Sequence, residues 1–248
     1  MAKLNFIPFF FPGLDNVSVV FTTRNGGRSK APFDEANLSF DVGDDPFDVR
    51  ANRTELAASL GIAHWHECRQ VHGDIIHYEP SKGTPGDETE LEGDGLATSA
   101  RGHALVIKTA DCQPIMLAHK NGSFVAGLHN GWRGNSINFP GQGVAEICGH
   151  YSCDPADLLA VRGPSLSPQA AQFVNFATDF EPGFEEYYDS AECTVDLWKL
   201  TKDQLIEAGL RPRNIYALDM CTFSMPRTFF SYRRERETGR MCSLIWIS

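Results

Sequence analysis

The chain has 248 residues, a hydrophobic content of 42% and a charged content of 22%. These values are ordinary for a globular protein and exclude disordered and fibrous classes. The formal net charge of −10 argues against a protein that coats nucleic acid, because phosphate backbones attract basic surfaces. No run of about 18 apolar residues occurs, so we expect no membrane span.

The first sixty residues predict a strand and a helix. The apolar stretch in residues 1–14 is short and broken by prolines, so we interpret it as a strand or loop rather than a signal peptide. Ser18–Thr22 is rich in β-branched residues and predicts a strand. A helix is expected from Pro46 to about Leu60, where Gly61 ends it.

The middle of the chain predicts strands that meet at polar turns. Glu67–Val71 and Asp74–Tyr78 are expected as strands on either side of His72, and Pro80–Gly93 as an acidic surface loop and candidate lid. Asn121-Gly122 predicts a two-residue hairpin turn.

Strands and helices alternate irregularly in the rest of the chain. The further strands expected are Ala104–Lys108, Pro114–Ala118, Ser123–Leu128, Asp157–Val161, Asn214–Leu218 and Ser243–Ile247. Helices are expected from just past Pro140 to near Gly149, and over Trp198–Ala208. This order predicts an α/β protein with a mixed sheet and helices on its faces, not a purely parallel wound sheet.

The cysteine pattern indicates reduced thiols. The seven cysteines are odd in number, and no Cys-x-x-Cys motif occurs. In a chain of this length, that pattern fits a cytoplasmic protein better than a disulfide framework.

Three residues combine reactive or metal-binding side chains with glycine-rich surroundings: His72, Cys112 and His129. Each lies at the end of an expected strand, where a side chain is held firmly and stays accessible. Taken singly, each has an ordinary structural interpretation, because buried cysteines and hydrogen-bonded histidines are common. The spacings between them, 40 and 17 positions, match no zinc finger, so the residues alone give only weak evidence for a shared site.

Several motifs along nearly the whole chain resemble one family. The motifs are Phe21-Thr22-Thr23-Arg24-Asn25-Gly26-Gly27, Val42-Gly43-Asp44-Asp45-Pro46, Gln70-Val71-His72-Gly73, Asp94-Gly95-Leu96-Ala97-Thr98, Thr109-Ala110-Asp111-Cys112-Gln113-Pro114, His129-Asn130-Gly131-Trp132-Arg133-Gly134, Asp219-Met220-Cys221-Thr222 and Phe229-Phe230-Ser231-Tyr232-Arg233-Arg234. The chain resembles the YfiH-like family, also called the polyphenol oxidase, laccase-domain or peptidoglycan editing factor-like family.

The resemblance implies a fold, an activity and a site. The fold is a single YfiH-like domain over residues 1–248, of α/β (α+β), CNF-like type with layered mixed sheets. The activity is purine nucleoside phosphorylase on adenosine, inosine and 5′-methylthioadenosine, with adenosine deaminase as a side activity. His72, Cys112 and His129 then form the catalytic and metal centre, holding Zn²⁺ with copper as the alternative ion, and Arg234 is a further catalytic residue. The partners implied are a nucleoside and phosphate, and the protein is a monomer or homodimer.

Phosphorolysis needs groups that hold phosphate, and the arginine fork suits this role because it pairs two oxygens. Arg24 and Arg133 are candidates, with Arg234, and Asn25 and Gln70 are expected to contribute to substrate binding. The backbone of residues 25–27 is able to point N–H groups at an anion. Asp111 is a candidate for orienting a histidine or for capping a turn.

Two other functions stay open from the residues alone. A copper polyphenol oxidase would use the same two histidines and cysteine, but the eight histidines of the chain are too few for a conventional multicopper laccase. Cys112 as a nucleophile with His129 as base would give a cysteine hydrolase acting on peptidoglycan precursors.

Overall fold

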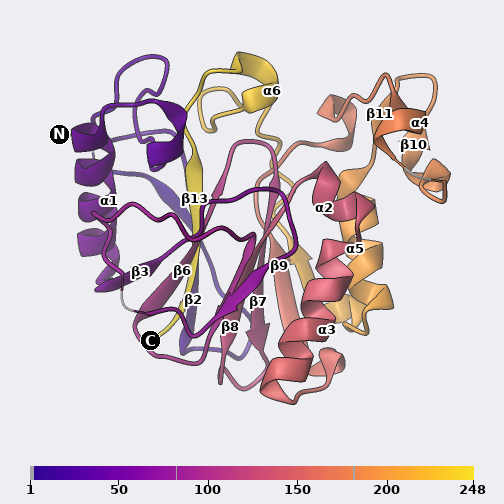
Figure 1. Cartoon of the computed structure of the whole chain (residues 1–248), viewed down its shortest axis with the longest axis horizontal. Helices are drawn as coiled ribbons and strands as arrows, with labels where there is room; N and C mark the ends of the chain where they lie inside the picture. Colours follow the sequence, from indigo (N-terminus) through magenta and orange to yellow (C-terminus); the bar gives the residue numbers. More distant parts are fainter. Residues whose placement is uncertain (1–2, 82, 181) are drawn as a thin grey trace.

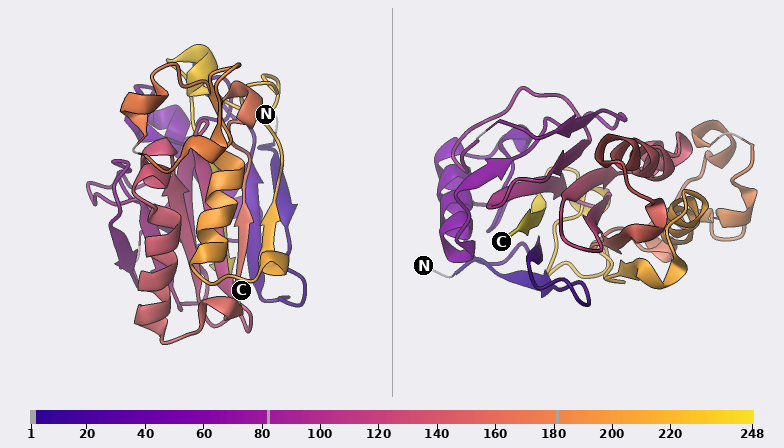
Figure 2. Two further views of the ribbon diagram at one scale, coloured as in Figure 1. Left: turned by 90° about the vertical axis from the view of Figure 1, so that its right-hand side faces the viewer. Right: turned by 90° about the horizontal axis from the view of Figure 1, so that it is seen from below.

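Two β-sheets lie face to face between layers of helices. The computed structural model describes residues 3–81, 83–180 and 182–248. Helix α1 (Pro46–Leu60) covers one sheet, and α3 (Phe139–Tyr151) and α5 (Leu197–Glu207) cover the other, so the order is helix, sheet, sheet, helices (Figures 1 and 2). The prediction of an α+β protein with layered mixed sheets is confirmed.

Both sheets mix parallel and antiparallel neighbours. The five-stranded sheet has the order β1 (Phe6–Phe9), β2 (Val17–Thr22), β13 (Met241–Ile247), β6 (His103–Thr109) and β3 (His64–His66). The six-stranded sheet has the order β12 (Ile215–Ala217), β9 (Leu158–Arg162), β7 (Gln113–His119), β8 (Val125–Asn130), β5 (Gly95–Thr98) and β4 (Ile76–Tyr78). The short elements are α2 (Trp132–Ser136), α4 (Phe176–Asp179), α6 (Tyr232–Glu235), the pair β10 (Tyr188–Asp189) and β11 (Thr194–Val195), and the 3₁₀ turns Phe40–Val42, Pro155–Asp157, Pro168–Ala170, Glu185–Tyr187 and Pro212–Asn214.

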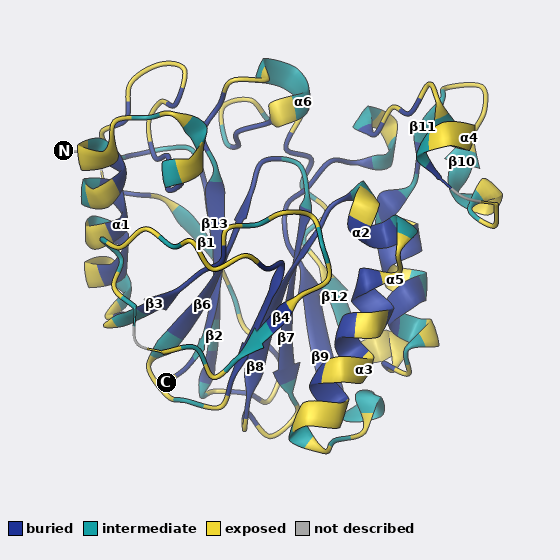
Figure 3. Cartoon of the chain, in the orientation of Figure 1, coloured by how far each residue is buried: buried dark blue, intermediate teal, exposed yellow. Residues whose placement is uncertain are grey.

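The main core lies between the inner faces of the two sheets. Phe21 and Ile107 of the first sheet pack in one cluster with Met116 and Val125 of the second, and all four are almost completely buried. The central strands of both sheets are buried, whereas the edge strands β1, β4 and β12 are partly exposed and the helices expose their outer faces (Figure 3). Because both faces of each sheet are covered, the strands are held rigidly and their ends can position side chains accurately.

Local signals fix the longest helix. Asp45 accepts a hydrogen bond from the backbone N–H of Phe47, Pro46 occupies the first turn, and Gly61 ends the helix with φ 69°. These are the N-cap, N1 and C′ preferences of an α-helix, and the predicted bounds of α1 are confirmed. Among the described helices, none is long and apolar enough to cross a membrane.

Two local predictions are wrong. Glu67–Val71 is not a strand: the strand lies at His64–His66, and beyond it only Arg69 makes an isolated bridge, to Glu92. The polar groups of this segment bond side chains and backbone of other elements instead: Gln70 bonds the backbone of Lys108, and the N–H of Val71 donates to Asp94. The hairpin at Asn121-Gly122 is longer than two residues, because β7 ends at His119 and β8 begins at Val125.

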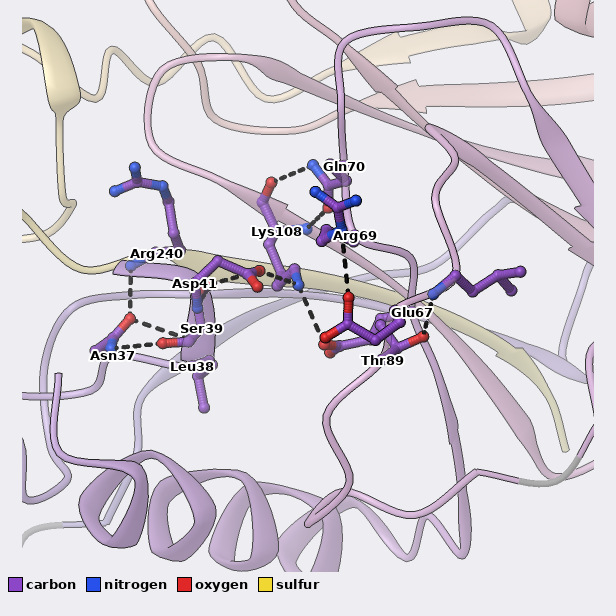
Figure 4. Close-up of polar contacts among 12 residues, drawn as sticks. Asn37, Leu38, Ser39, Asp41, Glu67, Arg69, Gln70, Thr89, Lys108 and Arg240 are labelled. Carbon is purple, nitrogen blue, oxygen red and sulfur yellow. Dashed lines mark hydrogen bonds and ion pairs between the residues drawn. The ribbon is translucent and has the colours of Figure 1, made fainter. Parts of the chain in front are cut away.

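A buried ion network joins α1 to the five-stranded sheet. Figure 4 shows its members Asp41, Glu67 and Lys108. Glu67 accepts from Arg53 at 2.9 Å, from Lys108 at 3.1 Å and from the Trp65 indole at 2.8 Å. Lys108 also pairs with Asp41 at 2.6 Å. Because the side chains of Arg53, Glu67 and Lys108 are almost wholly buried, each charge depends on its partners to offset desolvation.

Replacing Arg53 therefore tests how far the fold depends on this network. We expect Arg53→Ala to lower the free energy of unfolding by about 3–5 kcal/mol, because it leaves a buried carboxylate without its guanidinium partner. Urea denaturation, read from the midpoint with the m-value unchanged, measures the loss. Arg50→Ala on the exposed face of α1 is the matched control and should have a much smaller effect. Equal losses in the two variants would contradict the prediction.

Candidate active site

A cavity of about 810 Å³ opens at one end of the sheets. It is lined by residues from the ends of β6, β7 and β8 and from α2, α6 and the segment before α4. Helices α2 and α6 and the β10–β11 pair lie at the same end of the sheets in Figure 1. Its volume lies in the range of small-molecule sites.

His72, Cys112 and His129 meet in this cavity. His129 is on β8, and Cys112 is in the turn that precedes β7, the neighbouring strand. His72 comes from the loop between β3 and β4 and adopts a left-handed backbone conformation with φ 60°. The structure thus brings the three residues singled out in the sequence to one place.

The three side chains are close enough to share one metal ion. Their ligand atoms all lie within 4.8 Å of one another. Cys112 Sγ is 3.7 Å from His72 Nε2, and the two imidazole rings are 4.8 Å apart between centroids. Two nitrogens and one sulfur at this separation fit Zn²⁺ with a further position open to the cavity, and they also fit the ligand set of copper.

A buried carboxylate, Asp94, holds two of these residues in place. It directly precedes β5, which pairs with β8, and its Oδ1 accepts a hydrogen bond from His129 Nδ1 at 2.7 Å. The same carboxylate accepts from the backbone N–H groups of Val71, His72 and Gly73 at 3.2, 3.0 and 2.7 Å. Asp94 thus fixes both the tautomer of His129 and the loop that carries His72. His129 Nε2 is left as the nitrogen for a metal ion or for Cys112.

The local charges favour an ionised pair at the centre. Burial disfavours the Cys112 thiolate, but the charge of His129 and the contacts with both histidines outweigh it and lower the pKa of Cys112. Burial also disfavours the imidazolium of His129, but the Cys112 thiolate and Asp94 outweigh it and raise the pKa of His129. Cys68 and Cys242 lack such partners, and burial raises the pKa of each thiol to about 12. Cys112 thus differs from these two thiols in being suited to metal binding or nucleophilic attack.

Gly131 leaves the space that the centre occupies. A Cβ atom at this position would lie 3.0 Å from Cys112 Sγ and 3.1 Å from His72 Cδ2. These contacts are tighter than ordinary packing allows, so a larger residue would push the two side chains apart. The glycine of the His-Asn-Gly-Trp motif is therefore needed for the geometry of the site.

The five residues predicted to assist the centre divide into two groups. Gln70 and Arg133 line the cavity. The side-chain amide of Gln70 is bonded at both ends to the backbone of Lys108, at 2.8 and 2.7 Å. Arg24, Asn25 and Arg234 are not among the residues that line the cavity.

Arg24 and Arg234 serve the structure around α6 instead. The Arg234 guanidinium donates to the carbonyl oxygens of Thr222, Phe223 and Phe229. It also pairs with Glu235, as Arg24 does at 3.0 Å. These partners occupy their donors, so the geometry does not bring either guanidinium to a ligand in the cavity.

The backbone of residues 25–27 also has an internal partner. Gly26 N–H donates to the side chain of Glu35 at 2.9 Å, so the anion that this turn binds is a carboxylate of the chain itself. Asp111 does not orient a histidine. Its two oxygens accept from Thr222 Oγ1 and from the Arg233 backbone N–H, both at 2.6 Å.

Other residues at the site have roles that the sequence alone does not predict, although Asp94 and Arg233 stand in the family motifs. Asp94 is separated from His129 by 35 positions, and only the pairing of β5 with β8 brings them together. Arg233 and Arg240 line the cavity together with the aromatic rings of Trp132 and Phe173. The signal in the sequence is that Arg233 belongs to the Phe229–Arg234 motif and that Arg240 follows it shortly before the last strand.

Comparison with known proteins gives a family match. Residues 18–248 match the family model described as multi-copper polyphenol oxidoreductase laccase. A protein of Xylella fastidiosa (strain 9a5c) named purine nucleoside phosphorylase is 36% identical, covering 96% of this chain and 95% of its own length. A protein of Escherichia coli (strain K12) named purine nucleoside phosphorylase YfiH is 30% identical, covering 96% of both chains.

Solved structures agree in fold. The crystal structure of YlmD from Geobacillus stearothermophilus is 31% identical with a TM-score of 0.88, covering 95% of this chain and 93% of that one. The crystal structure of the Bacillus licheniformis hypothetical protein YfiH is 28% identical with a TM-score of 0.85, covering 94% and 93%. The layered arrangement of sheets is therefore shared with known proteins over nearly the whole chain.

The role of Asp94 can be tested by a change of charge at nearly constant shape. We expect Asp94→Asn to lower the affinity for Zn²⁺ by about 10- to 100-fold, because the carboxylate that orients His129 and anchors the His72 loop is lost. Competition with a chromophoric chelator measures the affinity, and circular dichroism checks that the variant is folded. Asp74→Asn, at an exposed position in the same loop, is the control. Unchanged Zn²⁺ affinity in the folded Asp94 variant would refute this role.

Proposed function

The chain belongs to the laccase-like YfiH family, and from that premise we propose that it is a purine nucleoside phosphorylase acting at the His72, Cys112 and His129 centre. The observation that carries the proposal is the convergence of this trio in a cavity of about 810 Å³. Relatives that match along nearly their whole length carry the name purine nucleoside phosphorylase, which supports an enzyme of this class.

Phosphorolysis exchanges one bond at C1′ of the ribose for another. A phosphate oxygen forms a bond to C1′, the C1′–N9 bond breaks, its electron pair leaves with N9, and the purine gains a proton. The enzyme must therefore hold phosphate beside C1′, keep water away and hold the purine in place while the bond breaks.

The cavity has suitable walls for these tasks. Trp132 and Phe173 form an aromatic wall with ring centroids 5.9 Å apart, which suits the flat face of a purine. Arg133 lies over the Trp132 ring at 4.5 Å and supplies positive charge at the rim. We assign substrate binding to these groups and the centre to His72, Cys112 and His129. Gln70, whose amide is held at both ends by the Lys108 backbone, is proposed to contact the substrate as part of the cavity wall.

We propose Zn²⁺ as the resident ion, held by His72 Nε2, Cys112 Sγ and His129 Nε2. When bound, the ion supplies Lewis-acid polarisation of a substrate oxygen or water. Asp94 keeps His129 oriented, and Gly131 leaves room for the trio. Three protein ligands with an open position are typical of catalytic zinc, so adenosine deaminase activity is included in the proposal as a side activity. Copper is the alternative ion that the family description suggests.

Adenosine, inosine and 5′-methylthioadenosine are the proposed nucleosides. The cytoplasm is the proposed location, because all seven cysteines are free, as in reducing compartments. We further propose that residues 1–248 form a single domain.

The activity is tested by incubating metal-analysed protein with adenosine and inorganic phosphate. We expect ribose 1-phosphate in an amount equal to the sum of adenine and hypoxanthine, the latter arising after deamination, and neither base when phosphate is omitted, because phosphate is a reactant. Chromatography of the nucleoside and base measures both. Unchanged nucleoside under conditions where the protein oxidises phenols would overturn the proposal in favour of a polyphenol oxidase.

Cys112→Ala separates a metal ligand from a nucleophile. We expect loss of bound Zn²⁺ together with loss of phosphorolysis, because the thiolate is one of three ligands. Metal analysis and turnover are measured on the same preparation, with Cys153→Ala, outside the residues that line the cavity, as the control. Full Zn²⁺ occupancy in an inactive Cys112 variant would instead identify Cys112 as a nucleophile.

A further inference from the structure

The buried and half-buried basic side chains of this acidic chain fall into two classes, those paired with a carboxylate and those without such a pair. Most are paired with carboxylates: Arg53 and Lys108 with Glu67, and Arg162 with Asp219. Two half-buried arginines that line the cavity, Arg233 and Arg240, differ from them. Over residues 3–81, 83–180 and 182–248, no carboxylate forms an ion pair with either guanidinium.

The hydrogen bonds of these two arginines leave one edge of each guanidinium unused. Arg240 donates from Nη1 to the carbonyl oxygens of Thr238 and Gly239, at 2.7 and 3.0 Å. Arg233 donates from Nη1 to the carbonyl oxygen of Gln172 at 2.6 Å. Within the described part of the chain, the Nε and Nη2 donors of both have no acceptor, and this edge is the fork that binds two oxygens of a phosphate or carboxylate.

Both arginines are held in place by their backbones. The Arg233 N–H donates to Asp111 at 2.6 Å, and the Arg240 N–H donates to Asn37 at 2.9 Å. Figure 4 shows the Arg240 side chain extending away from the Lys108 network, so it is not drawn into the pairing of Asp41 with Lys108. The two cations are therefore prepositioned rather than mobile on the surface.

Their position relative to the centre is also informative. Desolvation lowers the pKa of the Arg240 guanidinium, and the negative groups that oppose this effect include Cys112 and Asp111. Desolvation lowers the pKa of Arg233 in the same way. A protein with 32 acidic and 22 basic residues has many carboxylates with which to pair these cations. Asp111 attracts both cations and Asp41 attracts Arg240, yet neither carboxylate forms an ion pair with either guanidinium. The open edge of each guanidinium therefore indicates a place for an anionic ligand.

We propose that Arg233 and Arg240 form the subsite for inorganic phosphate, with the exposed Arg236 and Arg133 adding positive charge at the cavity rim. This inference rests on the proposed phosphorylase function and assigns one of its two substrates. It replaces the earlier prediction of Arg24 and Arg234, whose guanidiniums are occupied by Glu235 and carbonyl oxygens. The subsite lies beside the metal-binding trio, with the aromatic wall of Trp132 and Phe173 left for the purine.

The test measures phosphate separately from the nucleoside. We expect Arg240→Gln and Arg233→Gln each to raise the KM for phosphate by about 10- to 100-fold, since each loses charge-assisted hydrogen bonds to an anion. The KM for adenosine should change much less. Arg240→Lys, which keeps the charge and loses the fork, should recover only part of the loss. Arg213→Gln removes a charge at an exposed position outside the cavity lining and is the matched control.

Calorimetry of inorganic phosphate binding to the whole enzyme without nucleoside makes the two hypotheses separable. Binding that is lost in Arg233→Gln/Arg240→Gln supports the subsite even if no phosphorolysis is found, in which case only the proposed function fails.

Phosphorolysis with an unchanged phosphate KM in both single variants overturns the subsite and leaves the function standing. Phosphate binding that disappears on metal removal but not in the folded arginine variants also overturns it. Binding of adenosine 5′-monophosphate without binding of free phosphate would overturn inorganic phosphate as the occupant.

Discussion

The carboxylate of Asp94 is the contact on which the geometry of the candidate site depends. One side chain orients His129 and accepts three backbone N–H groups of the loop that carries His72. Since Asp94 is fully buried, each of these hydrogen bonds offsets part of its desolvation, and the loss of any one is costly. The two histidines reach the same point in space because both are tied to this carboxylate.

The sheets explain why such an arrangement can be rigid. β5, β7 and β8 are neighbours in the six-stranded sheet, and Asp94, Cys112 and His129 lie in or beside the ends of these strands. Both faces of this sheet are covered, by the other sheet and by α3 and α5. The strand ends therefore move little, and the loop of His72, which has no strand of its own at that point, takes its position from Asp94.

The sequence predicted much of the fold because its signals are local. The Asp45-Pro46 start and the Gly61 end of α1 belong to the helix itself, and the β-branched runs of β6 and β7 identify buried strands. Glu67–Val71 was mistaken for a strand because its polar groups find tertiary partners that no local pattern encodes. The trio is predicted from its motifs. Asp94 also opens a family motif, but its role is not predicted, since that role depends on which strands pair.

Charge pairing separates structural from functional arginines in this chain. Arg24 and Arg234 stand in family motifs, yet both share Glu235, so their conformations are set from within the protein. Arg240 stands just before the last strand. Within the described chain its Nη1 donates to two carbonyl oxygens, while its Nε and Nη2 donate to none. A half-buried cation without a carboxylate is unfavourable in the free protein. This desolvation cost is tolerated where a bound anion offsets it. An anionic co-substrate beside the metal-binding centre therefore explains why the unpaired guanidinium is present and why it lies in the cavity.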